Sequence, residues 1–342
     1  MPFHLILPGL LWPRKALRDT AHDLPLPNLS WLLGRGRPRW REAVPLENWL
    51  CREAGCGPDP RQSPAAALRL LGEGGDPGGD VWLCADPVHV RIEQGRAHLF
   101  SGDLDIDPEE MRQLAAALVP HFAEIGEFHA GAAGHGYLRL PQLPRLLATP
   151  PSAAAGRGNL LPSGADAAHW LRLGNEAQML LHALPLNARR AAAGRPTLNS
   201  LWFWGAGSLP ASGPTASGDY SMLIGDQPLL KGLAAWAGVA HQPAATDAPR
   251  LTHSSKATLL LLKELQQAAQ TLDAGAWRAA LLGLETTWLK TLVEGLRSGR
   301  LDRLRLTALG DEATLDISLT RADAMKFWRR PKPLHQLEFP QQ

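Results

Sequence analysis

The chain is 342 residues long and carries a formal net charge of +2. This length exceeds the roughly 250–300 residues at which a single hydrophobic core stops growing, so we expect two domains or one large α/β domain with an insertion. The small net charge provides no long-range field for nucleic acid or for an anionic membrane, and we expect neither as a partner. The three cysteines, Cys51, Cys56 and Cys84, form no C-x-x-C pair. They predict neither a zinc site nor a disulfide framework, and reduced thiols favour a cytoplasmic location.

The N-terminal half predicts short strands and helices separated by glycine and proline. The apolar run from Phe3 to Leu7 predicts a buried strand. The segment from Ser63 to Gly72 begins with a capping residue and a proline and ends at a glycine, which predicts a helix. After a glycine-rich break, Val81 to Val90 predicts a strand that forms a hairpin with Ala97 to Phe100. From Asp107 to Leu118, a capping residue, a proline and an acidic first turn predict another helix.

The C-terminal half predicts strands that alternate with helices, and this alternation favours an α/β sheet with one inserted α+β piece. Two segments, 304–309 and 313–319, alternate apolar and polar residues and predict a closing antiparallel pair. The arginines at alternate positions from 35 to 41 are interpreted as a solvated surface segment. The remaining predictions are helices over 175–184, 228–238, 256–272 and 276–296 and strands over 201–204 and 222–224.

One run in this half, from position 187 to 200, has the composition of a ligand-facing loop. Arg189, Arg190 and Arg195 lie within seven positions, and guanidinium groups bind carboxylates and phosphates through two parallel hydrogen bonds. Asn187 and Asn199 bracket them with neutral donors. We predict that these five residues bind a small phosphorylated or carboxylate ligand; the alternative is a solvated loop.

Four segments, taken in order, carry a family resemblance. They are the strand 80–86 after its glycine-rich break, the Asn-x-x-Arg pattern of 187–190, the asparagine and apolar strand of 199–207, and the strand and helix of 225–238. In this order they resemble the archaeal-type cofactor-independent phosphoglycerate mutases of the alkaline-phosphatase-like superfamily. The segments 82–89 and 201–205 are closer to a bacterial branch that looks like the RpfE-type regulatory proteins.

The resemblance implies an α/β fold in which helices sandwich an alkaline-phosphatase-like sheet. Residues 1–79 and 186–342 would form this core, and residues 80–185 would form an inserted, smaller α+β domain. It also implies a chemistry in which a serine or threonine attacks phosphorus beside two divalent metals such as manganese, held by aspartates and histidines. Ser63 matches the position of the family's nucleophile.

The residues that should complete this chemistry differ in the chain. The aspartate expected just after the nucleophile is Pro64, and the aspartate expected at the end of the first strand is replaced by Leu7-Pro8-Gly9. The Asp-His pair expected at the end of the last core strand is replaced by Ala308-Leu309, and the family's loop arginine by Trp204. Because hard oxygen ligands and imidazoles are missing from these places, we expect no metal cofactor and interpret Ser63 as a helix cap rather than a nucleophile.

These observations lead to one hypothesis and two alternatives. The hypothesis is a cytoplasmic regulatory or binding protein, a pseudoenzyme of the mutase-like fold that binds a small phosphorylated or carboxylate ligand or a protein partner. The first alternative is an active mutase or phosphatase with relocated ligands, which would draw on Asp86, His89, His129 or His135. The second is an interaction module that presents tryptophan-bearing surface to a partner, since the chain contains 12 tryptophans and indoles bury large areas.

Overall fold

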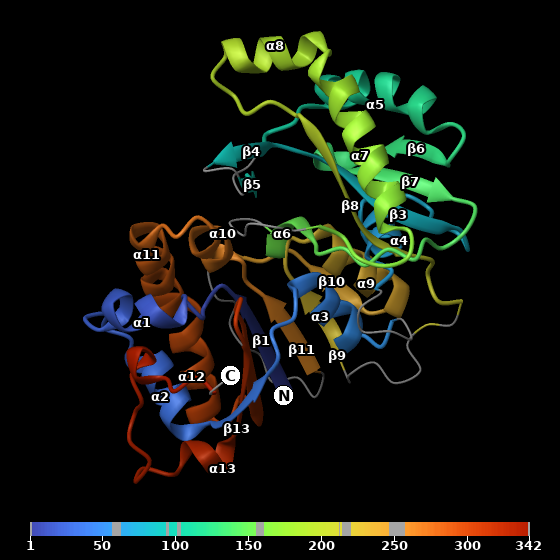
Figure 1. Ribbon diagram of the computed structural model, residues 1–342. Coiled ribbons are helices and arrows are strands. Elements are labelled where there is room, and N and C mark those ends of the chain that lie inside the picture. The colour runs from blue at the N-terminus through green and yellow to red at the C-terminus, as the bar shows by residue number, and fades with distance from the viewer. Residues whose placement is uncertain are drawn as a thin grey trace. The chain divides into compact units, whose positions relative to one another are not determined.

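The protein has a mixed α/β fold in which the chain divides into two compact units (Figure 1). The computed structural model describes residues 2–56, 63–93, 96–100, 104–154, 161–211, 213, 220–245 and 257–340. Unit 1 comprises residues 1–46, 218–226 and 239–342, and unit 2 comprises residues 47–217 and 227–238. The α/β class predicted from the sequence is therefore confirmed.

Within the described ranges, unit 1 is built on a seven-stranded mixed sheet (Figure 1). Strand β1 (Pro2–Pro8) lies parallel to β11 (Ala257–Leu261) on one side and to β12 (Arg303–Leu309) on the other. The far strands are β9 (Tyr220–Ile224) and β10 (Ala240–Gln242) beyond β11, and β13 (Thr314–Thr320) and β2 (Arg37–Arg41) beyond β12. Strands β12 and β13 pair antiparallel from Arg303–Thr320 to Leu309–Thr314, which confirms the predicted closing pair.

Helices cover the apolar side chains of this sheet. Leu5, Leu304 and Leu306 from the strands belong to the same buried core as Trp277 and Leu292 from the helices. Burial of such side chains is the main favourable contribution to folding. The helices of unit 1 are α1 (Arg14–Ala21), α2 (Pro27–Arg35), α10 (Glu264–Gln270), α11 (Ala274–Leu284), the π-helical turn η2 (Glu285–Leu289), α12 (Lys290–Ser298), α13 (Arg321–Ala324) and η3 (Leu334–Gln336).

One prediction in unit 1 was wrong, and another was confirmed in an unexpected element. The segment 256–272 was predicted as one helix, but β11 forms over 257–261 and α10 only from Glu264. A parallel strand buried on both faces is a continuous apolar run, which sequence periodicity alone does not distinguish from a buried helix. The arginine-rich segment 37–41 is the edge strand β2, paired with β13, although four of its five residues are exposed as expected of a surface segment.

Unit 2 contains a four-stranded antiparallel sheet of described residues in the order β6-β7-β3-β8. The predicted helix at Asp107 is confirmed as α5, with a complete capping box between Asp107 and Glu110. Helices α5 and α7 contribute Leu114, Phe122 and Trp170 to the apolar core under the sheet.

The strands of unit 2 in the described ranges are β3 (Val81–Val88), β4 (Val90–Glu93), β5 (Arg96–Leu99), β6 (Glu127–Ala130), β7 (Gly136–Leu140) and β8 (Ser200–Gly207). The helices are α3 (Leu46–Glu53), α4 (Ala65–Gly72), α5 (Pro108–Phe122), η1 (Ala132–Gly134), α6 (Pro151–Ala154), α7 (Ala167–His182), α8 (Pro185–Ala192) and α9 (Pro228–Ala237).

The strand that begins at Val81 does not form the predicted hairpin with residues 97–100. Strand β3 pairs with β7 and β8, and β5 pairs with β4 in a separate two-stranded ribbon. Strand β3 ends at Val88, and the side chain of Asn199 hydrogen-bonds the backbone of Val90. Tertiary pairing with β8, more than 100 residues later, therefore decides where β3 ends.

The expected division into a core and an inserted domain stays a prediction, and the two compact units group the residues in another way. Residues 47–79 and 186–217, expected in the core, group with the residues of the expected insertion. Strand β8 pairs with β3, and helix α4 packs against both strands and against α9. Among the helices of the described ranges, none is long and apolar enough to cross a lipid bilayer.

Candidate functional site

The predicted ligand loop begins as a helix. Residues 185–192 form α8, which starts with proline in its first turn, and the left-handed glycine Gly194 follows it. The buried amide of Asn187 donates to the carbonyl oxygens of Leu181 and Leu198 at 2.8 and 2.9 Å and accepts from the Leu198 amide at 2.7 Å. Its hydrogen-bonding groups therefore hold α8 against the segment that leads into β8.

Asn199 holds backbone in a similar way. Its Oδ1 accepts from the Val90 amide at 2.8 Å, and its Nδ2 donates to the Val90 carbonyl at 2.9 Å. The side chain thus ties the residue before β8 to the start of β4, just beyond the point where the pairing of β3 with β8 ends. The two asparagines are structural side chains in this conformation, and the arginines are the predicted residues left to contact a ligand.

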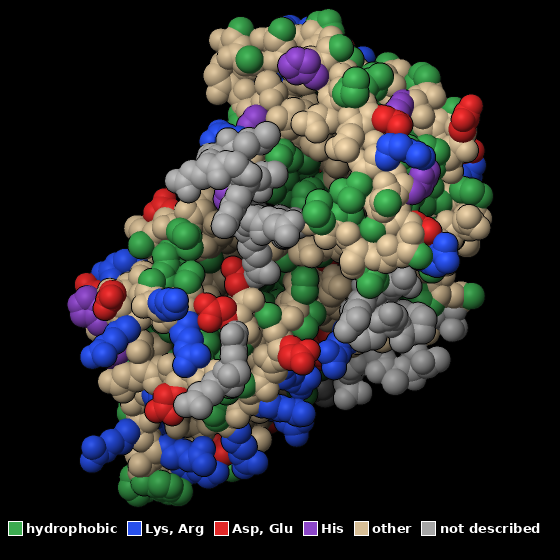
Figure 2. Space-filling model, in the orientation of Figure 1, with side chains coloured by type: hydrophobic (Ala, Val, Ile, Leu, Met, Phe, Trp, Pro, Cys, Tyr) green, Lys and Arg blue, Asp and Glu red, His purple; other side chains and the backbone are tan. Residues whose placement is uncertain are grey.

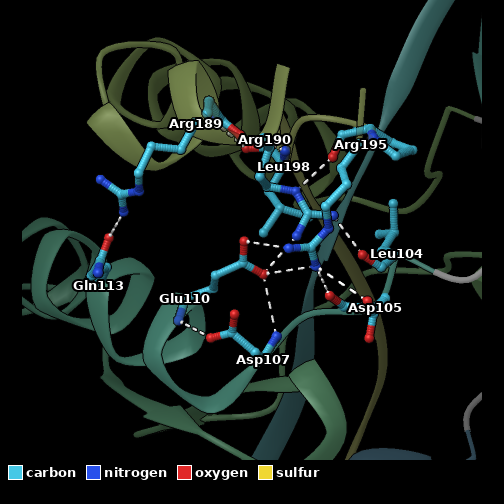
Figure 3. Close-up of polar contacts among 11 residues, drawn as sticks. Leu104, Asp105, Asp107, Glu110, Gln113, Arg189, Arg190, Arg195 and Leu198 are labelled. Carbon is cyan, nitrogen blue, oxygen red and sulfur yellow. Dashed lines mark hydrogen bonds and ion pairs between the residues drawn. The ribbon is translucent and has the colours of Figure 1, made fainter. Parts of the chain in front are cut away.

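Arg190 is buried, with 1% of its side chain exposed, and each of its three guanidinium nitrogens donates a hydrogen bond. Nη1 donates to Glu110 Oε2 at 2.6 Å, Nη2 to the carbonyl of Leu104 at 2.5 Å and Nε to the carbonyl of Pro196 at 2.7 Å. Figure 3 shows the guanidinium enclosed between α5 and the segment after α8. A buried charge needs such partners, and Glu110 supplies the compensating one.

Arg195 shares the same carboxylate. Its Nη1 and Nη2 each lie 3.3 Å from an oxygen of Glu110, and Nη2 also donates to the carbonyl of Asp105, whose carboxylate lies 3.5 Å away. One third of the Arg195 side chain is exposed. Glu110 therefore sits between two guanidinium groups, a bonding pattern that the sequence did not predict because 80 residues separate the partners.

Arg189 is the exposed member of the set. Its Nη2 donates a hydrogen bond to Gln113 Oε1 at 2.5 Å, so its partner there is a neutral amide rather than a carboxylate. The side chain borders an open pocket of about 460 Å³ between α5 and α8 (Figure 3). The pocket is lined by Asp107, Glu109, Glu110, Gln113, Arg189, Arg190, Ala193 and Arg195.

The second candidate position, Ser63, lies in a different environment. It does not cap α4, because Pro64 is the N-cap residue and no side chain caps this helix end. The Ser63 side chain is buried and hydrogen-bonds the Cys51 thiol. The pKa of Cys51 is nevertheless raised well above its ordinary value, chiefly by the hydrogen bond with Cys56 and by burial.

The pocket at Ser63 is very small. Its volume of about 10 Å³ is at the lower limit for one water molecule. Among the described residues that line it there is no carboxylate or imidazole: they are Asn48, Ser63, Leu146, Ala148, Trp204, Gly205 and Ala206. In this conformation the pocket has neither the volume nor the ligands for a phosphate ester with two metals.

Trp204, at the position of the family's loop arginine, belongs to a buried polar network. Its indole Nε1 donates to Asp86 Oδ2 at 2.7 Å, and Arg69 donates to both Asp86 oxygens at 2.8 and 2.6 Å. The Arg69 guanidinium also lies over the rings of Tyr137 and Trp204 at 4.7 and 5.3 Å. Burial acts to raise the pKa of Asp86, but the Arg69 charge and the hydrogen bonds from Arg69 and Trp204 together hold that pKa below its ordinary value.

The sequence analysis missed Arg69, and one signal could have drawn attention to it. Arg69 is the charged residue in the otherwise apolar helix segment Ala65 to Gly72. A charge in the middle of an apolar helix requires a buried partner or an exposed face. The sequence does not say which, and the structure supplies the partner on β3.

The side chains that an active enzyme would use as relocated metal ligands do not meet at one site. His135 Nδ1 lies 2.5 Å from Glu73 Oε1, His89 Nδ1 lies 2.8 Å from the carbonyl of Thr197, and His129 is beside Glu127. The carboxylate of Asp86 is occupied by Arg69, Trp204 and the amide of Gly136. No group of three or more His, Cys, Asp and Glu side chains that could hold a metal ion occurs among the described residues.

Comparisons with known proteins bear on the fold. No protein-family model matches the chain. The chain is 31% identical over 174 residues to the 2,3-bisphosphoglycerate-independent phosphoglycerate mutase of Methanosarcina barkeri, in an alignment that covers 46% of this chain and 43% of the relative. The chain thus spans less than half the length of this relative.

Two solved structures are similar over most of their length. The PH0037 protein from Pyrococcus horikoshii superposes with a TM-score of 0.51 at 15% identity, covering 98% of this chain and 91% of the other. The cofactor-independent phosphoglycerate mutase from Thermoplasma acidophilum gives a TM-score of 0.44 at 19% identity, with 93% and 89% covered. The fold is phosphoglycerate-mutase-like. The resemblance predicted from the four sequence segments is confirmed to this extent, and the narrower likeness to RpfE-type proteins stays a prediction.

Proposed function

We propose that this protein is a pseudoenzyme of the phosphoglycerate-mutase-like fold, which binds a small anionic ligand in a regulatory role and does not transfer phosphoryl groups. One observation carries the proposal. The pocket at Ser63, the position that matches the nucleophile, holds about one water molecule and has no carboxylate or imidazole among its described lining residues.

Phosphoryl transfer requires more than a hydroxyl group. The attacking oxygen must lose its proton, and divalent metals must neutralise charge on the phosphoryl oxygens. Small-molecule sites usually have volumes of roughly 300–1,000 Å³, far above that of the Ser63 pocket. Trp204 is fixed as one wall of this pocket by its hydrogen bond to Asp86, and the same aspartate is held by Arg69. Enlarging the pocket by moving Trp204 would break this buried network.

The pocket between α5 and α8 is the better supported ligand site. Its volume of about 460 Å³ suits a small metabolite. Arg190 and Arg195 share the negative charge of Glu110, while Arg189 contacts neutral Gln113. Three arginines and three carboxylates line the pocket, so its formal charge is balanced overall. Arg189, which contacts a neutral amide, is the guanidinium best placed to pair with a phosphorylated or carboxylate ligand. The regulatory role, the cytoplasmic location and the likeness to RpfE-type proteins belong to this proposal.

A turnover assay tests the absence of catalysis. Purified protein, supplied with excess manganese, is incubated separately with 2-phosphoglycerate and with 3-phosphoglycerate. The Ser63→Ala variant is assayed in the same way. We expect the same background rate for both proteins. Turnover well above background that disappears in S63A would overturn the proposal, because it would show that Ser63 reacts despite its small pocket.

A further inference from the structure

A cluster of exposed apolar side chains and cations lies at the end of unit 1 that carries α13. Phe327 is 82% exposed, Met325 70% and Trp328 67%, whereas large apolar side chains usually bury most of their surface. The Phe327 and Trp328 rings contact each other edge to face, with centroids 5.3 Å apart. We call this cluster the aromatic–basic tip; its members are Met325, Phe327, Trp328 and the cations Arg35, Arg37, Arg297, Arg329 and Arg330.

The backbone of the tip is held firmly by unit 1. Asp323 is buried, accepts from the amide and hydroxyl of Thr320 in a capping box, and pairs with Lys326 at 2.6 Å. Arg329 Nη1 donates to the carbonyl of Arg35 at 3.0 Å. The Lys332 amide donates to Ser30 on α2 at 2.9 Å. These bonds on both sides of Phe327 and Trp328 keep the two rings presented to solvent.

The cations of the tip carry more charge than nearby carboxylates compensate. Arg35 and Arg297 both lie over the Trp31 ring, at 5.0 and 4.8 Å. Burial and the neighbouring charge of Arg297 lower the pKa of Arg35. The buried Nε of Arg35 has no hydrogen-bond partner among the described residues. Like charges held this close favour an anionic counterpart.

The sequence around the tip adds no negative charge. From Ala324 to Leu337 it contains no aspartate or glutamate. Arg330 is exposed, and Arg37 is 70% exposed beside Asp323, which already pairs with Lys326. Figure 2 shows Lys and Arg side chains gathered beside a small apolar patch at the α13 end of unit 1.

We propose that the aromatic–basic tip docks the protein on an anionic lipid surface, although the small net charge of the chain led us to expect no membrane partner, because the charge of the tip is local. Three apolar side chains that are at least two-thirds exposed lie within four consecutive positions of the chain. Such a segment suits a soft medium that closes around it, where Trp and Phe side chains settle at the lipid headgroup level. The surrounding arginines add attraction to anionic headgroups. A nucleic acid would compensate the charge but offers no apolar medium for Met325 and Phe327 together.

Vesicle co-sedimentation of the full chain tests the proposal. The probes are vesicles of phosphatidylcholine alone and of phosphatidylcholine mixed with anionic phosphatidylglycerol. We expect binding to the mixed vesicles, weakened by added salt, and little binding to the neutral ones. The double variant Phe327→Ala/Trp328→Ala should bind about tenfold more weakly, and Arg330→Ala about fivefold more weakly.

Two matched controls separate the tip from general effects. Met179→Ala on α7 removes a side chain that is 76% exposed in unit 2, and Arg172→Ala removes an arginine that is 67% exposed there. Both should bind vesicles like the parent chain. Since the tip side chains are exposed, the variants should also unfold at the same urea concentration as the parent.

Three results would overturn the proposal. They are equal binding to neutral and anionic vesicles, unchanged vesicle binding by F327A/W328A, and tighter binding of polyglutamate or single-stranded DNA than of anionic vesicles. The last result would assign the tip to an acidic protein or a nucleic acid.

Discussion

The two arginine clusters of this protein differ in how far their charge is compensated. In unit 2, the arginines of the segment after α7 are neighbours in sequence, and two of them share Glu110. At the aromatic–basic tip of unit 1, the arginines come from α2, β2, α12 and the segment after α13. There, Arg35 and Arg297 face the same indole.

This difference shows that arginines close in sequence are not necessarily available to a ligand. A guanidinium that is buried beside a carboxylate is part of the structure, and its charge is used within the protein. A guanidinium held among other cations keeps its charge for an external anion. Burial and partners decide between the two, and both are tertiary properties.

The largest expected effect is the loss of the buried ion pair in unit 2. Arg190→Ala leaves Glu110 without its closest cation, and we expect a loss of about 3–5 kcal/mol in the free energy of unfolding. Urea unfolding followed by circular dichroism measures it. Arg189→Ala is the matched control. The Arg189 side chain is exposed, so its removal should change the free energy of unfolding by less than about 0.5 kcal/mol. Equal effects of the two variants would contradict the assigned roles.

The carboxylate under the tip should have the next largest effect. Asp323→Asn removes the negative charge and one of the two oxygens that accept from Thr320 and Lys326, and we expect a loss of about 1–3 kcal/mol at neutral pH. Burial acts to raise the pKa of Asp323, but hydrogen bonds from Lys326 and Thr320 hold it well below its ordinary value.

The sign of the pH dependence follows from that shift. Because the folded-state pKa is depressed, the stabilisation is complete above the unfolded-state pKa of 3.8 and is lost as the pH falls through the lower, folded-state pKa. The difference between parent and D323N, measured by urea unfolding at a series of pH values, should shrink in acid. A difference that stays constant down to the lowest pH would show that the charge of Asp323 is not the cause.

Ligand binding should separate Arg189 from the rest of its cluster. Charge-assisted hydrogen bonds contribute about 1.5–3 kcal/mol, so we expect Arg189→Ala to weaken the binding of 3-phosphoglycerate by about tenfold or more. Isothermal titration calorimetry measures this affinity, with Arg172→Ala as the control for charge. No binding by the parent chain would remove the α5–α8 pocket as a ligand site and leave the outcome of the turnover assay unaffected.

The smallest effect is expected at the tip. Arg297→Ala removes one cation over Trp31, and the lost cation–π contact is offset by relief from the neighbouring Arg35 charge. We expect a change in stability of less than about 0.5 kcal/mol in urea unfolding, in contrast to R190A. A loss of several kcal/mol would mean that the cations of the tip are structural, as Arg190 is.

Part of the fold could be predicted because local patterns determine it. The capping box at Asp107 fixed the start of α5, and the alternating segments 304–309 and 313–319 paired as predicted. Segment 257–261 could not be assigned, because an apolar run buried on both faces has no strand period. The sequence also identified Arg189, Arg190 and Arg195 but not Glu110, since nothing local connects residues 80 positions apart.

By itself, the sequence determined the α/β class and the mutase-like order of segments, and it predicted that acidic and histidine residues are missing from the positions that the resemblance implies. Only the tertiary structure decided that the Ser63 pocket is water-sized, that Glu110 compensates Arg190 and Arg195, and that cations from four separate segments meet at the aromatic–basic tip. The physical reason is the range of the interactions. Caps and periodicity act within a few residues, whereas burial and charge compensation depend on which distant segments pack together.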